Sequence, residues 1–145
     1  ADIVDAKTRS RMMAGIRGKN TTPEVRLRKA LHGAGFRFRL HSAKLPGRPD
    51  IVLPRYRAAI FVHGCFWHRH DGCRNASVPK TNAVFWEEKF ARNIERDATN
   101  ISSLDEGGWR VAIIWECAIR KRGEAEVAAE LAIWLKNGGR DLEIG

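Results

Sequence analysis

A nine-residue segment, residues 65–73, carries two thiols, two imidazoles and two large aromatic rings. Its sequence is CFWHRHDGC, and a third imidazole, that of His63, lies two positions upstream. Thiols and imidazoles this close together indicate a metal site. Adjacent Phe and Trp side chains in a basic chain indicate a flat partner such as a nucleobase. The segment therefore predicts both a metal-bound scaffold and a nucleic-acid contact.

The predicted metal site uses every cysteine of the chain. Its four ligands are Cys65, His70, Cys73 and Cys117. Thiolate and imidazole ligands at tetrahedral count favour zinc, and four protein ligands leave no position for a catalytic water, so we expect a structural zinc site. Asp71 and His68 are competing ligands. An ordinary buried thiol at Cys117 with free loop cysteines is the other interpretation.

A second group of residues has the chemistry of a nuclease. Asp50 stands where a Pro-containing turn enters a strand, and the backbone carbonyl near Val62 ends the next strand, so both offer oxygen to magnesium. His63 and His68 are expected at the same sheet end, where an imidazole exchanges protons near neutral pH. Each histidine alone is more typical of a structural role. Their convergence with Asp50 favours a catalytic site.

Composition limits the possible partners of the chain. Its 145 residues suit one domain, and 26 Lys plus Arg against 17 Asp plus Glu give a formal charge of +9, which favours a polyphosphate partner over a merely soluble basic surface. Three cysteines, no apolar span and no signal-peptide pattern predict a cytoplasmic, nucleoid-associated protein without a membrane partner.

Hydrophobic patterning predicts a single α/β domain over residues 1–145. Residues 1–20 read as an N-terminal arm with a short helix that docks or contacts DNA. Thr22 is expected to cap the first long helix, and residues 83–104 to form a helix with an apolar face that includes Phe85 and Ile94. The expected elements are helices over 22–31, 83–104 and 124–134, and strands over 36–40, 50–53, 58–62 and 109–115. A central mixed sheet flanked by helices follows, although the strand order does not.

Five sequence blocks in order closely resemble the very short patch repair endonucleases. The blocks are PGRPDIV at 46–52, HGCFWH at 63–68, PKTN at 79–82, NIERD at 93–97 and WRV through WEC at 109–117. The resemblance covers nearly the whole chain. It implies a restriction-endonuclease-like fold, a structural zinc, and a magnesium-dependent nick in double-stranded DNA 5′ to the T of a T:G mismatch. Such mismatches arise when 5-methylcytosine deaminates.

The resemblance also implies roles for individual residues. Asp50 matches the family's metal-binding aspartate and His68 its catalytic histidine, and the supporting catalytic residues match His63, Glu24 and Asp97. The zinc ligands match the four residues already named. The predicted DNA-contacting residues are Met13, Phe66, Trp67, Trp86, Lys89 and Asn93. Apolar side chains wedged between base pairs cost stacking energy, and that cost is lowest at a mismatched step.

Other interpretations stay open. The chain has Phe61-Val62-His63 where the wider restriction-like superfamily has an acidic-x-Lys pair, so water activation would pass to histidine. A small nuclease that cuts an undamaged sequence, or a noncatalytic zinc-containing DNA-binding module, would share many of these residues. We expect a monomer whose nicked product passes to downstream repair proteins.

Overall fold

The structure, a computed structural model, describes residues 20–145. The expected helix of the N-terminal arm and Met13 therefore lie outside the described residues. Five strands form one mixed sheet in the order β1-β2-β3-β4-β5. The strands are β1 (Arg39–Leu40), β2 (Ile51–Leu53), β3 (Ala58–His63), β4 (Arg110–Trp115) and β5 (Leu142–Ile144). The first three are antiparallel neighbours, whereas β3, β4 and β5 run parallel.

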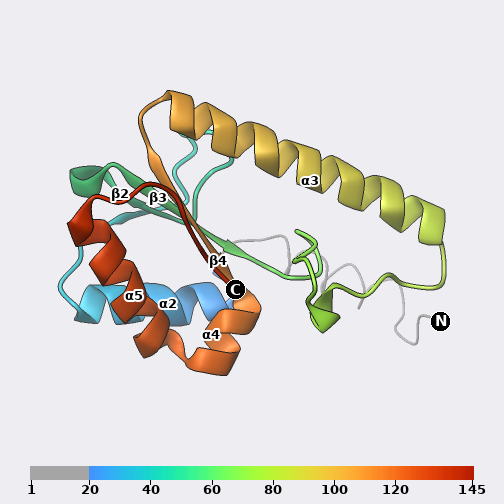
Figure 1. Cartoon of the computed structure of the whole chain (residues 1–145), viewed down its shortest axis with the longest axis horizontal. Coiled ribbons are helices and arrows are strands. Elements are labelled where there is room, and N and C mark those ends of the chain that lie inside the picture. The colour runs from blue at the N-terminus through green and yellow to red at the C-terminus, as the bar shows by residue number, and fades with distance from the viewer. Residues whose placement is uncertain (1–19) are drawn as a thin grey trace.

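Helices cover both faces of this sheet (Figure 1). They are α2 (Thr22–Gly33), α3 (Ala83–Glu106), α4 (Glu116–Arg122) and α5 (Glu124–Asn137), with the short 3-10 turns η1 (Pro54–Tyr56) and η2 (Arg74–Ala76). Helices α2, α4 and α5 lie on one side and the long α3 on the other. The predicted α/β class with a mixed sheet flanked by helices is confirmed.

Alternation along β3 divides the core between the two faces. Ala58 and Ile60 pack into the larger cluster with α2 and α5, whereas Ala59 and Phe61 pack with Leu104 of α3. Successive side chains of a strand point to opposite faces, so a strand buried on both faces reads as a continuous apolar run. This is why the apolar sequence of β3 forms a central strand.

The helix boundaries follow local chemistry. Pro23 occupies the first turn of α2 and Glu24 supplies its acidic residue, as the sequence predicts. The N-cap is Thr21 rather than Thr22, and its hydroxyl makes no capping hydrogen bond. At the far end of the chain α5 stops at Gly138, whose φ of 71° lies in the left-handed region that glycine tolerates.

Several elements differ from the expectations. The strand expected over 36–40 is paired only at Arg39 and Leu40. Helix α4 and strand β5 were not predicted. Phe85 and Ile94 are 52% and 50% exposed, so the expected apolar face of α3 is wrong at these two positions. The helix extends past the edge of the sheet in Figure 1, which leaves its N-terminal half without a sheet beneath it. Among residues 20–145, no helix has both the length and the apolar character needed to cross a membrane.

Candidate active site

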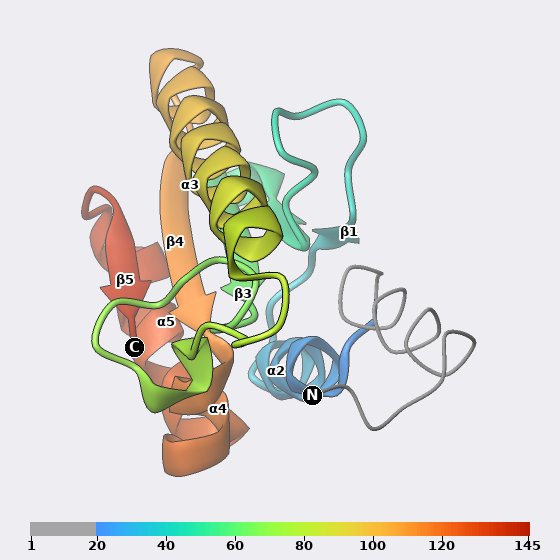
Figure 2. The ribbon, with the colours of Figure 1, turned by 90° about the vertical axis from the view of Figure 1, so that its right-hand side faces the viewer.

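The candidate active site lies at one end of the sheet. The parallel strands β3 and β4 both end here, at His63 and Trp115. Because β2 runs antiparallel to β3, the start of β2 reaches the same end and brings Asp50 with it. The loop of residues 64–82 then passes between these strand ends and the start of α3 (Figure 2). A cavity of about 830 Å³ is lined by Glu24, Asp50, His63, His68 and Asp97, together with parts of the loop.

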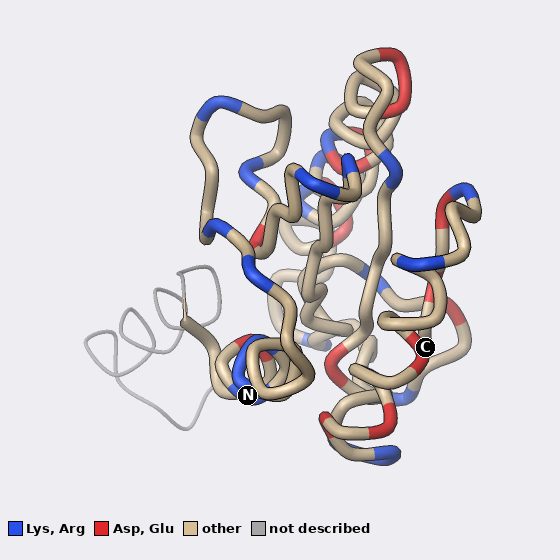
Figure 3. The backbone as a smooth tube through the Cα atoms, turned by 90° about the vertical axis from the view of Figure 1, so that its left-hand side faces the viewer, with Lys and Arg blue, Asp and Glu red and all other residues tan. Residues whose placement is uncertain are grey.

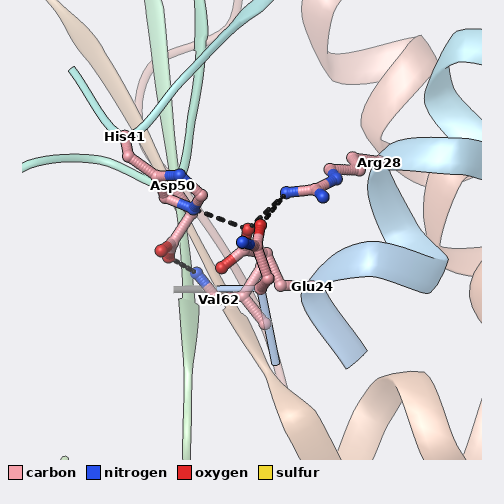
Figure 4. Close-up of polar contacts among 6 residues, drawn as sticks. Glu24, Arg28, His41, Asp50 and Val62 are labelled. Atoms are coloured by element: carbon pink, nitrogen blue, oxygen red, sulfur yellow. Dashed lines mark hydrogen bonds and ion pairs between the residues drawn. The ribbon is translucent and has the colours of Figure 1, made fainter. Parts of the chain in front are cut away.

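Two carboxylates meet at the start of β2 (Figure 4). Asp50 Oδ2 accepts a 2.7 Å hydrogen bond from the Val62 backbone N–H. Glu24, only 2% exposed, accepts hydrogen bonds through Oε2 from Arg28 Nη1 at 2.9 Å and from His41 Nε2 at 2.7 Å. Ligand atoms of Glu24, His41 and Asp50 lie within 4.8 Å of one another, so this group could hold a metal ion.

The electrostatics of Asp50 suit a cation. Burial raises the pKa of Asp50 to about 7, the Val62 N–H lowers it, and the nearby Glu24 carboxylate raises it further. A carboxyl group that is hard to ionise on its own would be stabilised as the anion by a bound cation, because a divalent ion is the largest local charge in such a site. Ionisation of Asp50 beside Glu24 therefore costs free energy, and a bound cation would offset that cost.

Two histidines stack beside the carboxylates. The rings of His63 and His68 lie 3.8 Å apart with an interplanar angle of 4°. His68 Nδ1 and Asp97 Oδ2 are 2.6 Å apart. Since the aspartate accepts the hydrogen on Nδ1, the other ring nitrogen, Nε2, is the one able to accept a proton. The predicted residues His63, His68 and Asp97 are therefore brought together in one cluster.

The pKa of His63 is strongly lowered. Burial lowers the pKa of His63 to about 3, with a further lowering from His68 and a small opposing effect of Asp97. Its Nδ1 is buried and has no hydrogen-bond partner among residues 20–145. His63 is therefore neutral at physiological pH and cannot serve there as a proton donor through an imidazolium form.

The four predicted zinc ligands also converge. Ligand atoms of Cys65, His70, Cys73 and Cys117 lie within 4.8 Å of one another. The Sγ atoms of Cys65 and Cys117 are 3.6 Å and 3.4 Å from His70 Nδ1. Metal–sulfur and metal–nitrogen bonds of a tetrahedral zinc site place sulfur and nitrogen about 3.5 Å apart. The donor set and its spacing therefore fit a tetrahedral metal ion.

Further contacts orient this Cys/His cluster. The His70 ring stacks on Trp115, with centroids 4.3 Å apart and planes at 9°. Cys65 N–H donates to Glu116 Oε1 at 3.3 Å, which fastens the loop to the start of α4. Burial raises the pKa of the Cys65 thiol to about 12. A coordinated cation reverses that preference, because metal ligation favours the thiolate.

The predicted DNA-contacting aromatics form one cluster. Phe66 contacts Trp67, Trp86 and Phe90 with ring centroids 5.1 to 5.6 Å apart. Trp67 is only 6% exposed, and its Nε1 has no hydrogen-bond partner within the described part of the chain. Phe66 and Trp86 are partly exposed. In this structure Phe66 and Trp86, rather than Trp67, therefore offer ring surface to a partner.

Lys89 and Asn93 lie on the face of α3 that holds this aromatic cluster. Lys89 Nζ is 5.8 Å from the centroid of the Trp67 ring. Asn93 is buried, and its Nδ2 donates to the Trp67 carbonyl at 3.1 Å while its Oδ1 accepts from Arg96. The structure thus gives Asn93 a loop-anchoring contact in addition to its predicted role.

Sequence reasoning did not single out Arg28 and His41. Both reach Glu24 Oε2, Arg28 from the next turn of α2 and His41 from the residue after β1. The spacing of Glu24 and Arg28, four residues apart on one helix, is a signal that could have identified the first. His41 could be found only through the pairing of β1 with β2, which sets it beside Asp50.

Positive charge gathers on residues 37–57, which contain β1, β2 and the turn between β2 and β3. Figure 3 shows Lys and Arg on the segment that contains β1, the loop to β2 and η1. Its basic residues are Arg37, Arg39, Lys44, Arg48, Arg55 and Arg57, and Asp50 is its single acidic residue. A predominantly basic segment of this kind attracts a phosphate backbone.

Comparisons with known proteins point to one family. A family model described as DNA mismatch endonuclease Vsr matches residues 1–74. The DNA mismatch endonuclease Vsr of Escherichia coli (strain K12) is 46% identical over 147 residues, which cover 99% of this chain and 94% of the relative.

Two type II nicking enzymes are also similar. V.XorIIP of Xanthomonas oryzae pv. oryzae (strain KACC10331 / KXO85) is 45% identical over 125 residues, 86% of this chain and 91% of the relative. V.NmeAIP of Neisseria meningitidis serogroup A is 42% identical over 121 residues, 83% of this chain and 86% of the relative. The match to the family model and the identity over nearly the full length establish that this chain belongs to the Vsr family of DNA mismatch endonucleases.

Proposed function

We propose that this protein nicks one strand of double-stranded DNA 5′ to the T of a T:G mismatch. Membership of the Vsr family supports mismatch-directed endonuclease activity. The observation that carries the proposal is the single cavity that joins the paired carboxylates to the stacked histidines. A DNA-binding module without catalysis has no need of an aspartate whose pKa is raised by desolvation and by a neighbouring carboxylate. We assign the α/β sandwich to the restriction-endonuclease-like class.

Magnesium is the proposed cofactor at Asp50. A strand residue directs its N–H and C=O to the same side, so the Val62 N–H that reaches Asp50 implies a Val62 carbonyl on that side too. An aspartate oxygen and a backbone carbonyl are ligands that magnesium prefers. A cation held there would stabilise negative charge that develops on the scissile phosphate. Glu24 is close enough to orient water beside it.

His68 is the proposed general base. Asp97 fixes the ring by accepting the hydrogen on Nδ1, which leaves Nε2 to take a proton from the attacking water. His63 stays neutral because of its low pKa, and its ring stacked at 3.8 Å restricts the rotation of His68. We therefore assign proton acceptance to His68 alone and a positioning role to His63. The two histidines do not act as an acid and base pair.

Zinc is the proposed ion of the Cys/His cluster. Three sulfur donors and one ring nitrogen at tetrahedral spacing match zinc, and the four protein ligands leave no open position. The ion would hold the loop of residues 64–82 against Trp115 and α4, so that His68 enters the cavity. Its proposed role is structural.

The aromatic cluster is the proposed mismatch wedge. Phe66 and Trp86 present ring surface beside the cavity, and Trp67 packs behind them as support. Insertion of such rings unstacks a base step, and the penalty is smaller at a mispaired step than at a paired one. Lys89, Asn93 and Met13 remain proposed DNA contacts.

The test compares T:G and T:A duplexes that differ at one base. We expect the wild-type protein with Mg²⁺ to nick only the T-containing strand of the T:G duplex. Asp50→Ala should bind the duplex and leave both strands intact. Equal cleavage of the T:A duplex would identify a nuclease for undamaged sequence, and binding without any cleavage would identify the noncatalytic module.

A further inference from the structure

We propose that His41 is a positioning residue, which together with Arg28 holds the Glu24 carboxylate against Asp50 so that the two carboxylates bind a divalent cation. The inference rests on the proposed cation at Asp50 and adds a residue to that site. His41 comes from the end of β1, Glu24 from α2 and Asp50 from the start of β2. The three segments meet only in the folded protein (Figure 4).

The contacts of Glu24 show two donors on one atom. His41 Nε2 at 2.7 Å and Arg28 Nη1 at 2.9 Å both reach Oε2, so neither of them uses Oε1. Glu24 and His41 are shielded from solvent, with side-chain exposures of 2% and 12%. Two charge-assisted bonds from different elements leave the carboxylate little rotational freedom. The arrangement fixes the direction in which Glu24 faces Asp50.

Glu24 needs to be held because it faces another carboxylate. Like charges repel, and ligand oxygens of Glu24 and Asp50 lie within 4.8 Å of one another. A free glutamate would rotate away and reduce this repulsion. Arg28 offsets part of the charge, but it lies on the same helix as Glu24 and turns with it. His41 is the donor that ties Glu24 to the strand side of the cavity.

The backbone of His41 also contacts one member of the carboxylate pair. Its N–H donates to the Asp50 carbonyl at 3.2 Å, so one residue is bonded to both members of the carboxylate pair. Its φ of 48° lies in the left-handed region, where histidine occurs more often than most residues. Ala and Gln at this position share the same backbone cost. A comparison of these two variants therefore isolates the side-chain hydrogen bond.

Direct ligation by His41 is the alternative. A separation of 2.7 Å from a carboxylate oxygen is a hydrogen bond, which means that Nε2 carries a hydrogen and does not offer its lone pair. A glutamine amide can replace that donated hydrogen bond but is a poor substitute for an imidazole ligand. The glutamine variant consequently separates positioning from ligation.

The test measures Mn²⁺ binding to the zinc-loaded full chain by electron paramagnetic resonance, without DNA. We expect His41→Ala to raise the Kd for Mn²⁺ about tenfold, which is the effect of one hydrogen bond to a charged group. His41→Gln should stay within about threefold of wild type by the same reasoning. His32→Ala, at an exposed histidine in the last turn of α2, is the matched control and should bind as wild type.

A double-mutant cycle gives the most specific readout. In a Glu24→Gln background, adding His41→Ala should change the Kd no further, because a positioning residue acts only through the group it positions. Wild-type Mn²⁺ affinity in His41→Ala, failure of Gln to restore binding, or additive losses in the double variant would each overturn the proposal. If His41→Ala does not fold, His41→Asn, whose amide is one methylene shorter than that of Gln, takes the place of His41→Ala in the comparison with His41→Gln and in the Glu24→Gln cycle.

Nicking assays on the same samples separate the two proposals. If the variants change the Kd for Mn²⁺ as expected but the wild-type protein does not cleave mismatched DNA, the role of His41 is supported and the proposed function is refuted. If the wild-type protein cleaves mismatched DNA but His41→Ala binds Mn²⁺ with unaltered affinity, the proposed function is supported and the role of His41 is refuted. Absence of Mn²⁺ binding by wild type would overturn the inference about His41.

Discussion

Two ligand-rich clusters lie at the same end of the sheet and differ in what they offer a cation. The Cys/His cluster has three sulfurs and one ring nitrogen packed around a fully buried Cys65. The cluster at Asp50 and Glu24 has carboxylate oxygens, and it opens into a cavity of about 830 Å³. Closed soft ligands suit a structural ion, and open oxygen ligands suit one that keeps water and meets substrate. The ligand type and the solvent access of each cluster, rather than its position in the fold, distinguish the proposed structural site from the proposed catalytic site.

The two clusters are linked through a short stretch of chain. His70 belongs to the Cys/His cluster and His68, two residues earlier, belongs to the cavity. Damage to the Cys/His cluster should therefore disturb His68 as well. Damage at Asp50, by contrast, should leave the Cys/His cluster intact, because β3 separates β2 from β4, the strand that leads to Cys117. The experiments below test this asymmetry.

The largest effect is expected from removal of catalytic groups in the cavity. Asp50→Ala and His68→Ala should each lower the single-turnover nicking rate at least about 10³-fold, because an electrostatic anchor or a general base is lost. Gel-shift affinity for the T:G duplex and zinc content should change little. Turnover that persists in either variant would refute the assignment of that residue.

Removal of a proposed zinc ligand should act on the whole loop. Cys117→Ser is expected to lose zinc and to lower the free energy of unfolding by roughly 3 kcal/mol or more, since binding of a structural ion contributes directly to folding. Elemental analysis and chemical denaturation measure the two quantities on one sample. Asp50→Ala is the control and should retain about one zinc per chain. Stability unchanged by Cys117→Ser would mean that no structural ion is present.

The metal-free cavity should respond to pH through Asp50. Its pKa is raised to about 7 in the folded state from an ordinary value of 3.8, so stability from the protonated form is present below pH 4 and is lost as pH rises through 7. Asp50→Asn cannot ionise. In EDTA it should be more stable than wild type at pH 8, by up to about 4 kcal/mol, and nearly equal at pH 4.

His63 contributes to the pH dependence of stability with the opposite sign, so the stability of wild type must be compared with that of Asp50→Asn. Its pKa is lowered to about 3, so its contribution is present above pH 6.5 and is lost as pH falls through 3. It affects wild type and Asp50→Asn alike and cancels in their difference. A stability difference that does not grow between pH 4 and pH 8 would contradict a raised pKa at Asp50.

A smaller effect is expected from the aromatic cluster. Trp67→Ala should lower the preference for T:G over T:A by about tenfold and weaken binding to matched DNA less, because Trp67 supports the Phe66 and Trp86 rings whose stacking carries the discrimination, whereas phosphate contacts do not. Competition binding with the two duplexes measures the ratio. Phe66→Ala, at a more exposed ring, is the companion variant. Equal losses on both duplexes would exclude the wedge.

The sequence predicts those parts of the site that depend on strand ends and residue chemistry. Asp50 and His63 flank apolar runs whose lengths define strands, so their convergence follows from sheet formation. The Cys/His ligands are recognisable by residue type alone. His41 escapes such reasoning because its contact with Glu24 depends on a left-handed turn after a two-residue strand. No periodicity encodes that turn.

The helix α3 shows a second limit of sequence reasoning. Its apolar residues follow a helical stripe, yet Phe85 and Ile94 are exposed while the polar Asn93 is buried. The reason is tertiary: the N-terminal half of α3 extends past the sheet and meets the loop of residues 64–82, where the Trp67 carbonyl needs a donor. A pattern cannot reveal which partner a helix face meets.

One measurement tests the division between the two clusters most directly. A protein sample is treated briefly with EDTA, and its zinc content and its nicking of a T:G duplex are recorded together before and after Mg²⁺ is added. We predict that nicking stops while about one zinc per chain remains, and that Mg²⁺ alone restores it. Loss of zinc in parallel with nicking, or recovery only when zinc is supplied, would contradict separate structural and catalytic metal sites.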